Sequence, residues 1–232
     1  MTFRLDPVLL SGLQFFGFTT ASVTHELKNA LAIIKENAGL LDDYTQCMAR
    51  GQPIDGARVR TVISRIEEQT RRADGIIRNL NSFAHSVDEL EKSVDLNAVV
   101  ELLVALAHRP AAMQRVNLVR RPAAGPVMLS TLPFLLLSGL GRFLNMVLPA
   151  AGPGQELIIS VAKSPGGGGI VTFAPLPGLA QLPAERFGRE EESPLRQLQA
   201  AYHLDPAAGH ITITLGDAGQ AALEHAKENA NG

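Results

Sequence analysis

The stretch ASVTHELKNALAIIKENAGLL, from Ala21 to Leu41, has the residue spacing of a long amphipathic helix. In and around it, one set of mostly apolar positions recurs at alternating intervals of four and three residues. This heptad spacing is typical of a helix that packs lengthwise against another helix. The positions are Thr20, Thr24, Leu27, Leu31, Ile34, Ala38, Leu41, Thr45 and Met48. We therefore expect one long helix with a heptad packing seam.

A second helix of the same kind is expected after a short turn. The residues from Ala49 to Ala57, ARGQPIDGA, contain glycine and proline, which interrupt a helix. The seam then resumes at Val59, Val62, Ile66, Gln69, Ala73, Ile76, Leu80, Phe83, Val87 and Leu90. Such an antiparallel hairpin has too small a core to be stable alone. We therefore predict that it pairs with a second copy, which gives a homodimer with a four-helix bundle.

The second half of the chain has the pattern of a sheet with helices. Short β-branched runs bounded by glycine, proline or polar residues indicate strands at 116–121, 125–130, 156–164, 168–175 and 210–217. Helical spacing lies between them at 96–109, 132–148 and 193–204. The order predicts a mostly antiparallel sheet with helices on one face, an α/β sandwich. The expected fold class is α+β, with a helical domain at 1–93 and a sandwich domain at 94–232.

Composition and charge exclude several classes of partner. The formal net charge is −2 over 232 residues, so the chain has no positive electrostatic field that would attract a polyanion. No nucleic-acid partner is therefore expected. The apolar stretch from Leu132 to Pro149 carries Arg142 near its middle, which indicates a buried helix and no membrane span. The start lacks the order of a secretory signal, and the lone Cys47 fits a reducing compartment. We expect a soluble, cytoplasmic protein without a metal site, because the histidines lack metal-ligand spacing.

The helix around His25 gathers side chains that suit phosphoryl transfer. His25 follows the seam residue Thr24, so its ring is expected to point away from the seam, and Asn29 lies one turn further on the same face. A neutral imidazole nitrogen can accept a phosphoryl group if a base such as Glu26 removes the proton on the other nitrogen. An amide one turn away can orient a water or bind phosphoryl oxygens. The same residues are also compatible with an ordinary solvated helix face.

The segment THELKNALAII, from Thr24 to Ile34, resembles the phosphoacceptor box of sensor histidine kinases. In that box a His-Glu pair is followed by small or amide residues and then by apolar ones. The resemblance continues more weakly through VDLNAVVELLVAL and RVNLVRRPAAGPVMLS, which look like the join to the ATP-binding domain and its first strands. It implies that His25 carries the phosphoryl group and that Glu26 is its acid-base partner. Asn29 would stand where dephosphorylating members place a water-orienting residue.

The second half departs from the nucleotide site of that family in three places. Met146, with Asn145 beside it, aligns with the magnesium-binding asparagine. Ala174 replaces the adenine-binding aspartate, and Leu176 replaces a glycine. Three glutamates, Glu190 to Glu192, stand where a glycine-rich loop would wrap the phosphates, and their charge repels a polyphosphate. We therefore expect a degenerate kinase-type domain that binds no nucleotide cofactor.

The expected function is a histidine phosphotransferase that relays phosphoryl groups between aspartates of response regulator receiver domains. The donor is an upstream kinase or the receiver of a hybrid kinase, and the receiver supplies the Mg²⁺ ion. The receiver is expected to dock over Ala32, Ile33 and Glu36, where the first two give a small apolar centre. A non-catalytic pseudokinase binding module and a response-regulator phosphatase are the alternatives, followed by a kinase with an unusual nucleotide pocket.

Two further groups are expected to be structural. The arginines of the second helix are expected to form a solvated face: Arg71, Arg72 and Arg78. The aromatic residues near the start are expected to pack in the core or in the dimer: Phe15, Phe16 and Phe18.

Overall fold

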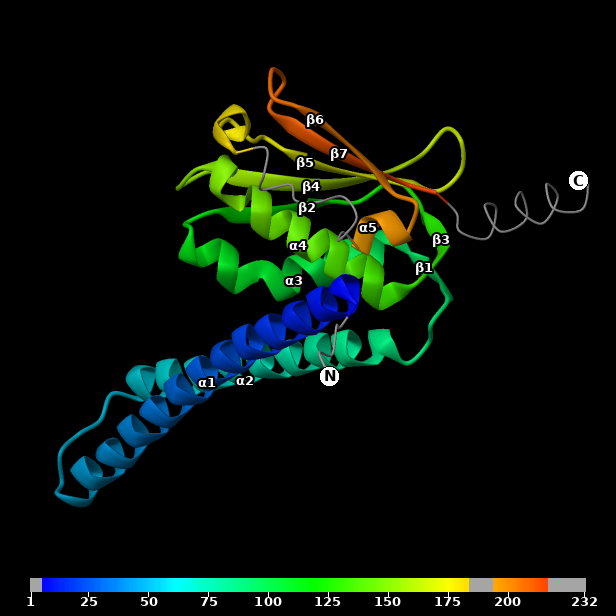
Figure 1. Cartoon of the computed structure of the whole chain (residues 1–232). Helices are drawn as coiled ribbons and strands as arrows, with labels where there is room; N and C mark the ends of the chain where they lie inside the picture. The colour runs from blue at the N-terminus through cyan, green and yellow to red at the C-terminus, as the bar shows by residue number, and fades with distance from the viewer. Residues whose placement is uncertain (1–5, 184–193, 217–232) are drawn as a thin grey trace, which may run out of the picture. The chain divides into compact units, whose positions relative to one another are not determined.

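The computed structural model of the chain describes residues 6–183 and 194–216 (Figure 1). The chain divides into two compact units. The hairpin unit is Thr20–Ser82, and the sheet unit joins Met1–Thr19 to Phe83–Gly232. The predicted α+β fold, a helical hairpin followed by an α/β sheet domain, is confirmed.

Two helices, α1 (Pro7–Ala49) and α2 (Gly56–Ala84), form the hairpin (Figure 1). Asp6 begins α1 by accepting a hydrogen bond from the backbone N–H of Val8 at 2.7 Å. The predicted turn lies between the helices, and Gly51 there has a φ of 78°, which favours glycine. The carboxylate of Asp55 accepts from the N–H of Ala57 at 2.9 Å and so caps the start of α2.

The two helices differ in how well their seams were predicted. On α2 the predicted positions are buried or half-buried, among them Val62 and Ala73. On α1 the buried positions include Val23 and Ala30, one residue before the predicted seam, whereas Leu31 of that seam is 53% exposed. The stripe of α1 that is buried within one chain thus lies one residue before the predicted seam. An antiparallel pair buries one stripe of each helix, and α1 carries a second apolar stripe beside it.

The sheet unit contains a five-stranded sheet in the order β2-β4-β5-β7-β6. Its strands are β2 (Asn117–Arg121), β4 (Glu156–Lys163), β5 (Gly169–Ala174), β6 (Ala201–Asp205) and β7 (His210–Leu215). β2 and β4 are parallel, and the other neighbouring strands are antiparallel. The helices α3 (Leu96–Met113) and α4 (Pro133–Ala151) lie on one face of this sheet, as predicted (Figure 1).

Two short strands join the start of α3 to the rest of the unit. β1 (Lys92–Asp95), which the sequence pattern did not predict, pairs antiparallel with β3 (Met128–Thr131). Asp95 Oδ1 accepts hydrogen bonds from the backbone N–H groups of Asn97 and Val127, both at 3.0 Å. One carboxylate therefore caps α3 and also holds the segment that leads into β3.

The predicted helix at 193–204 was wrong over most of its length. Residues Pro194–Gln197 form a single helical turn, α5, and Ala201–Asp205 form β6. Gln199 between them has a φ of 53°, which ends the helix. β6 pairs with β7 over five residues, and this ladder overrides the local helical spacing. The short 3₁₀ helices η1 (His85–Val87) and η2 (Leu179–Gln181) complete the described elements.

An aromatic cluster holds the first turns of α1 within the sheet unit. Phe83 is fully buried, and its ring centre lies 5.7 Å from that of Phe15, 5.1 Å from Phe16 and 6.1 Å from Phe134. Phe15 also packs against Gly141 of α4, where a Cβ would overlap the ring. The expectation of core packing thus holds for Phe15 and Phe16, whereas Phe18 is 53% exposed.

Two helices among the described residues, α3 and α4, are long and apolar enough to cross a membrane by length and composition alone. Within the folded chain, 33% of the apolar window of α3 and 67% of that of α4 are buried. The mostly buried α4 has the burial expected of a core helix.

Candidate functional site

His25 lies on α1 in the hairpin unit, where the chain has good helix formers and no proline. Its side chain is exposed and makes no hydrogen bond or ion pair with any other residue that the structure describes. Asn29 is exposed one turn further along the helix. The expected docking residues continue this exposed face of α1: Ala32, Ile33 and Glu36.

Glu26 lies differently from His25, although the two residues are neighbours in sequence. Consecutive side chains of a helix diverge by about 100°, so neighbours in sequence can have different surroundings. The Glu26 side chain is 13% exposed, and its Oε2 forms an ion pair with Nη2 of Arg72 on α2 at 3.7 Å. The ion pair therefore joins the Glu26 carboxylate of α1 to α2.

Arg72 is the residue near this site that the sequence interpretation missed. We expected Arg71, Arg72 and Arg78 to form a solvated face of α2. Arg71 and Arg78 do pair with exposed acids of their own helix, Glu67 and Asp74 respectively. Arg72 instead reaches α1. The sequence did contain a sign of this contact. Glu26 directly precedes the seam residue Leu27, and Arg72 directly precedes the seam residue Ala73, so both side chains lie at the edge of a seam.

This arrangement has the parts needed for a covalent transfer. The imidazole of His25 is open to an incoming group, and a carboxylate at the next position can exchange a proton with the ring. The amide of Asn29 lies on the same exposed face and can donate hydrogen bonds to phosphoryl oxygens or orient a water.

The residues aligned with a kinase nucleotide site belong to the sheet unit. Asn145 on α4 lines a small cavity of about 10 Å³ together with Phe15, Phe18 and Leu103. The side chain of Asn145 therefore borders the packing of α4 with α3 and with the first turns of α1. Met146 beside it is half-buried.

The segment after β5 packs directly on the end of α4. Leu176 and Leu179 are buried, and the N–H of Gly178 donates to the carbonyl of Ala150 at 2.8 Å. A Cβ at Gly178 would lie 3.1 Å from the backbone of Ala150. Ala174, at the end of β5, supplies no carboxylate for an adenine amine. Glu190 to Glu192 lie outside the described residues.

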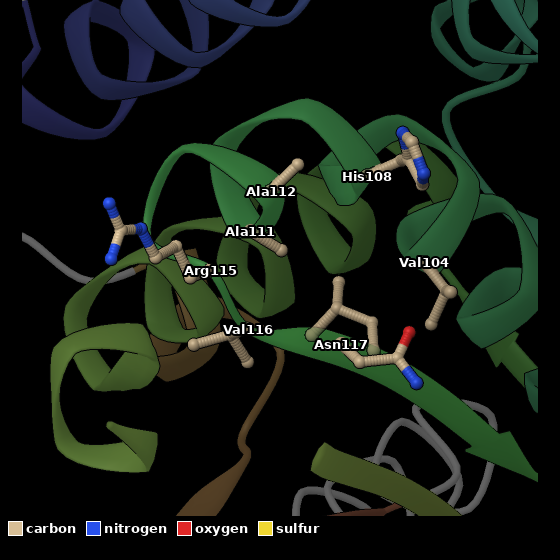
Figure 2. A pocket seen from close by; sticks show the side chains of 8 residues that line it. Val104, His108, Ala111, Ala112, Arg115, Val116 and Asn117 are labelled. Carbon is tan, nitrogen blue, oxygen red and sulfur yellow. The ribbon is translucent and has the colours of Figure 1, made fainter. Parts of the chain in front are cut away.

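A second, larger cavity of about 300 Å³ lies between the end of α3 and the start of β2. Figure 2 shows His108 and Val104 on one side of it and Arg115 on the other, with Val116 and Asn117 between them. Its three polar side chains are all exposed, so the cavity provides no buried polar anchor for a ligand. None of its lining residues belongs to the exposed face around His25.

Comparison with known proteins identifies the hairpin. Residues 17–88 match the family model of the His Kinase A (phospho-acceptor) domain, and this range contains His25, Glu26 and Asn29. No curated protein matches the chain. The phosphoacceptor resemblance of the hairpin is thereby confirmed. The match assigns a phospho-acceptor domain to residues 17–88, the helical hairpin, and to no other part of the chain.

Several solved structures are similar to this chain at low identity. Histidine kinase AdeS of Acinetobacter baumannii is 14% identical, with 83% of this chain and 98% of that chain covered and a TM-score of 0.45. A bacterial phosphotransferase is 13% identical, with 92% and 97% covered and a TM-score of 0.46. The mycobacterial sensor histidine kinase MprB is 18% identical, with 54% and 96% covered and a TM-score of 0.42.

Proposed function

We propose that this protein is a histidine phosphotransferase that accepts phosphoryl groups from one response regulator receiver domain and passes them to another. The observation that carries the proposal is the exposed His25 within a segment that matches the phospho-acceptor domain. His25 is the phosphoacceptor, Glu26 the acid-base group and Asn29 the residue that positions the phosphoryl oxygens.

The transfer is an in-line displacement at phosphorus. A lone pair on one ring nitrogen of His25 attacks the aspartyl phosphate, and the bond between phosphorus and the aspartate oxygen breaks. The electron pair stays with the aspartate, which leaves as a carboxylate. Glu26 takes the proton from the other ring nitrogen and returns it when the phosphoryl group moves on. Mg²⁺ held by the receiver neutralises the charge on the transferred group, so this chain needs no metal site.

The absence of an ATP-dependent step is part of the proposal. It is supported by Ala174 at the end of β5 and by the buried Leu176, which occupy the adenine-binding positions of the family pattern. It is also supported by the packing of Gly178 against the backbone of Ala150, which leaves no room for an added Cβ without movement. The phosphoryl group therefore comes from a receiver.

A dimer is the second part of the proposal, because the hairpin leaves apolar residues uncovered. Leu31 and Met48 on α1 and Ile63 and Ile77 on α2 are exposed large hydrophobic residues. The first two lie on the predicted seam, and the last two are two heptads apart on one face of α2. A second copy of the hairpin covers such stripes in a four-helix bundle.

Receiver docking on α1 is the third part of the proposal. Asn29, Ala32, Ile33 and Glu36 form one exposed face that continues from His25. Ala32 and Ile33 give this face an apolar centre between polar neighbours, which suits a transient interface. Docking there brings the aspartyl phosphate of a receiver next to the ring of His25.

The test is phosphoryl uptake from isolated receiver domains. Receivers carrying a radiolabelled phosphoryl group are mixed with the wild-type protein, with His25→Ala and with Lys28→Ala, an exposed neighbour, as the control. The relay is supported if acid-labile label appears on the wild type and on Lys28→Ala but not on His25→Ala. Loss of receiver label without labelled protein identifies a phosphatase, for which the exposed amide of Asn29 is the favouring feature. Unchanged receiver label identifies a binding module.

A further inference from the structure

We propose that α2 presents a basic stripe, Arg58, Arg65 and Arg72, that binds an acidic surface of the docking receiver domain, an inference that rests on the proposed function. The three arginines stand seven residues apart, so they lie on one face of the helix. With a rise of about 1.5 Å per residue, the stripe is roughly 20 Å long. The docking face proposed above lies on α1 alone, and the basic stripe extends it to the second helix of the hairpin.

The contact between Arg72 and Glu26 shows which side of the hairpin the basic stripe occupies. Their ion pair, at 3.7 Å, marks one level at which the two antiparallel helices meet (Figure 1). Seven residues further along α1 is Ile33, and seven residues back along α2 is Arg65. Seven residues are about two helical turns, so both steps return to the same face and cover the same length of helix. Arg65 therefore lies level with Ile33, on the side of the hairpin that carries the proposed docking face.

Two cations of the basic stripe are available to a partner. Arg58 and Arg65 are exposed and form no ion pair with any other residue in the part of the chain that the structure describes. Arg71 and Arg78 of the same helix, by contrast, each pair with an acid one turn away. Such pairing within a helix neutralises much of the charge that a partner would meet. Arg58 and Arg65 keep their full charge.

The charge of α2 is complementary to that of a receiver. The helix carries six arginines and three acidic residues, so its formal charge is +3, whereas that of the whole chain is −2. A receiver that holds Mg²⁺ with carboxylates has an acidic surface around its aspartate. The docking face on α1 contributes one acid, Glu36, which the cations of the basic stripe outnumber. Complementary charges of this kind speed the encounter and fix the orientation of the partner more than they strengthen the complex.

The experiment measures the binding of a receiver domain to the immobilised full chain at about 50 and 300 mM salt, and phosphoryl uptake from the same receiver. The double variant Arg58→Gln/Arg65→Gln should lower the association rate constant about fivefold at the lower salt concentration and less than about twofold at the higher one. The matched control, Arg60→Gln/Arg71→Gln, removes the same charge from another face of α2 and should bind as the wild type does. The double variant Arg58→Lys/Arg65→Lys keeps the charge and should also bind as the wild type does.

Three results would overturn the inference. They are equal association rates for Arg58→Gln/Arg65→Gln and the wild type at low salt, an equal loss for the control, and a loss that persists at high salt. A short DNA duplex that binds the wild type but not Arg58→Gln/Arg65→Gln would assign the basic stripe to nucleic acid and would overturn it as well.

Failure of the proposed function gives a different result. A wild-type protein that neither binds nor takes up a phosphoryl group from any receiver overturns the relay, and the inference with it. A receiver that binds and phosphorylates the wild type and Arg58→Gln/Arg65→Gln equally well at low salt overturns the inference alone.

Discussion

Replacing Phe83 with alanine tests the aromatic cluster that holds the first turns of α1 within the sheet unit. The Phe83 ring is fully buried and lies within 6.1 Å, centre to centre, of the rings of Phe15, Phe16 and Phe134. Truncating a buried phenylalanine to alanine costs about 3–5 kcal/mol, because the transfer free energy of the ring is lost and a cavity remains. Three ring pairs put this position at the upper end of that range.

The assay is thermal unfolding by calorimetry, with Phe18→Ala as the matched control. A unit of this size loses roughly 2–4 °C of melting temperature per kcal/mol, so Phe83→Ala should melt about 6–20 °C lower. Phe18 is 53% exposed, and its truncation should cost less than about 1 kcal/mol. If the two variants lose the same small amount, the cluster does not pack as described.

Three further predictions concern the cap of α3, the packing at Gly178 and the dimer. Asp95→Ala should lower the free energy of unfolding by about 2–4 kcal/mol in urea titrations. The reason is that it removes the cap of α3 and leaves the Val127 N–H without its acceptor. A loss below about 0.5 kcal/mol would contradict this. Gly178→Ala should lower the free energy of unfolding by about 1–3 kcal/mol, because its Cβ would lie 3.1 Å from the Ala150 backbone. Gly166→Ala, whose Cβ meets open space, should lower it far less. Equal losses for the two variants would refute the packing at Gly178. Leu31→Lys should raise the dissociation constant of the dimer roughly 100-fold in analytical ultracentrifugation, because two copies of an apolar contact are lost; a monomeric wild type would refute the dimer.

Most of the fold was predictable because local pattern and tertiary packing agree. The α2 seam follows strict heptad spacing, and the burial of Val62 and Ala73 follows it. β4 and β5 are β-branched runs bounded by turn residues, and they pair as neighbours in the sheet. In these elements the periodicity of the sequence reports directly which side is covered.

The errors arose where a distant contact decides the local structure. Residues 201–204 have helical spacing, but the ladder with β7 holds them as a strand. The stripe of α1 that α2 covers was displaced by one residue, because two adjacent apolar stripes run along that helix. Within the site, the positions of His25 and Asn29 follow from helix geometry alone. The pairing of Glu26 with Arg72 depends on how the two helices align, which no single-helix pattern contains.

In the proposed relay, His25 receives its phosphoryl group from a receiver and not from ATP. The most direct measurement is intact-protein mass spectrometry of the wild type and His25→Gln after incubation with Mg-ATP or with a phosphorylated receiver. We expect the added mass of one phosphoryl group on the wild type with the phosphorylated receiver but not with Mg-ATP, and none on His25→Gln with either donor. Phosphorylation of His25 by Mg-ATP, or receiver-dependent phosphorylation of the His25→Gln variant, would contradict it.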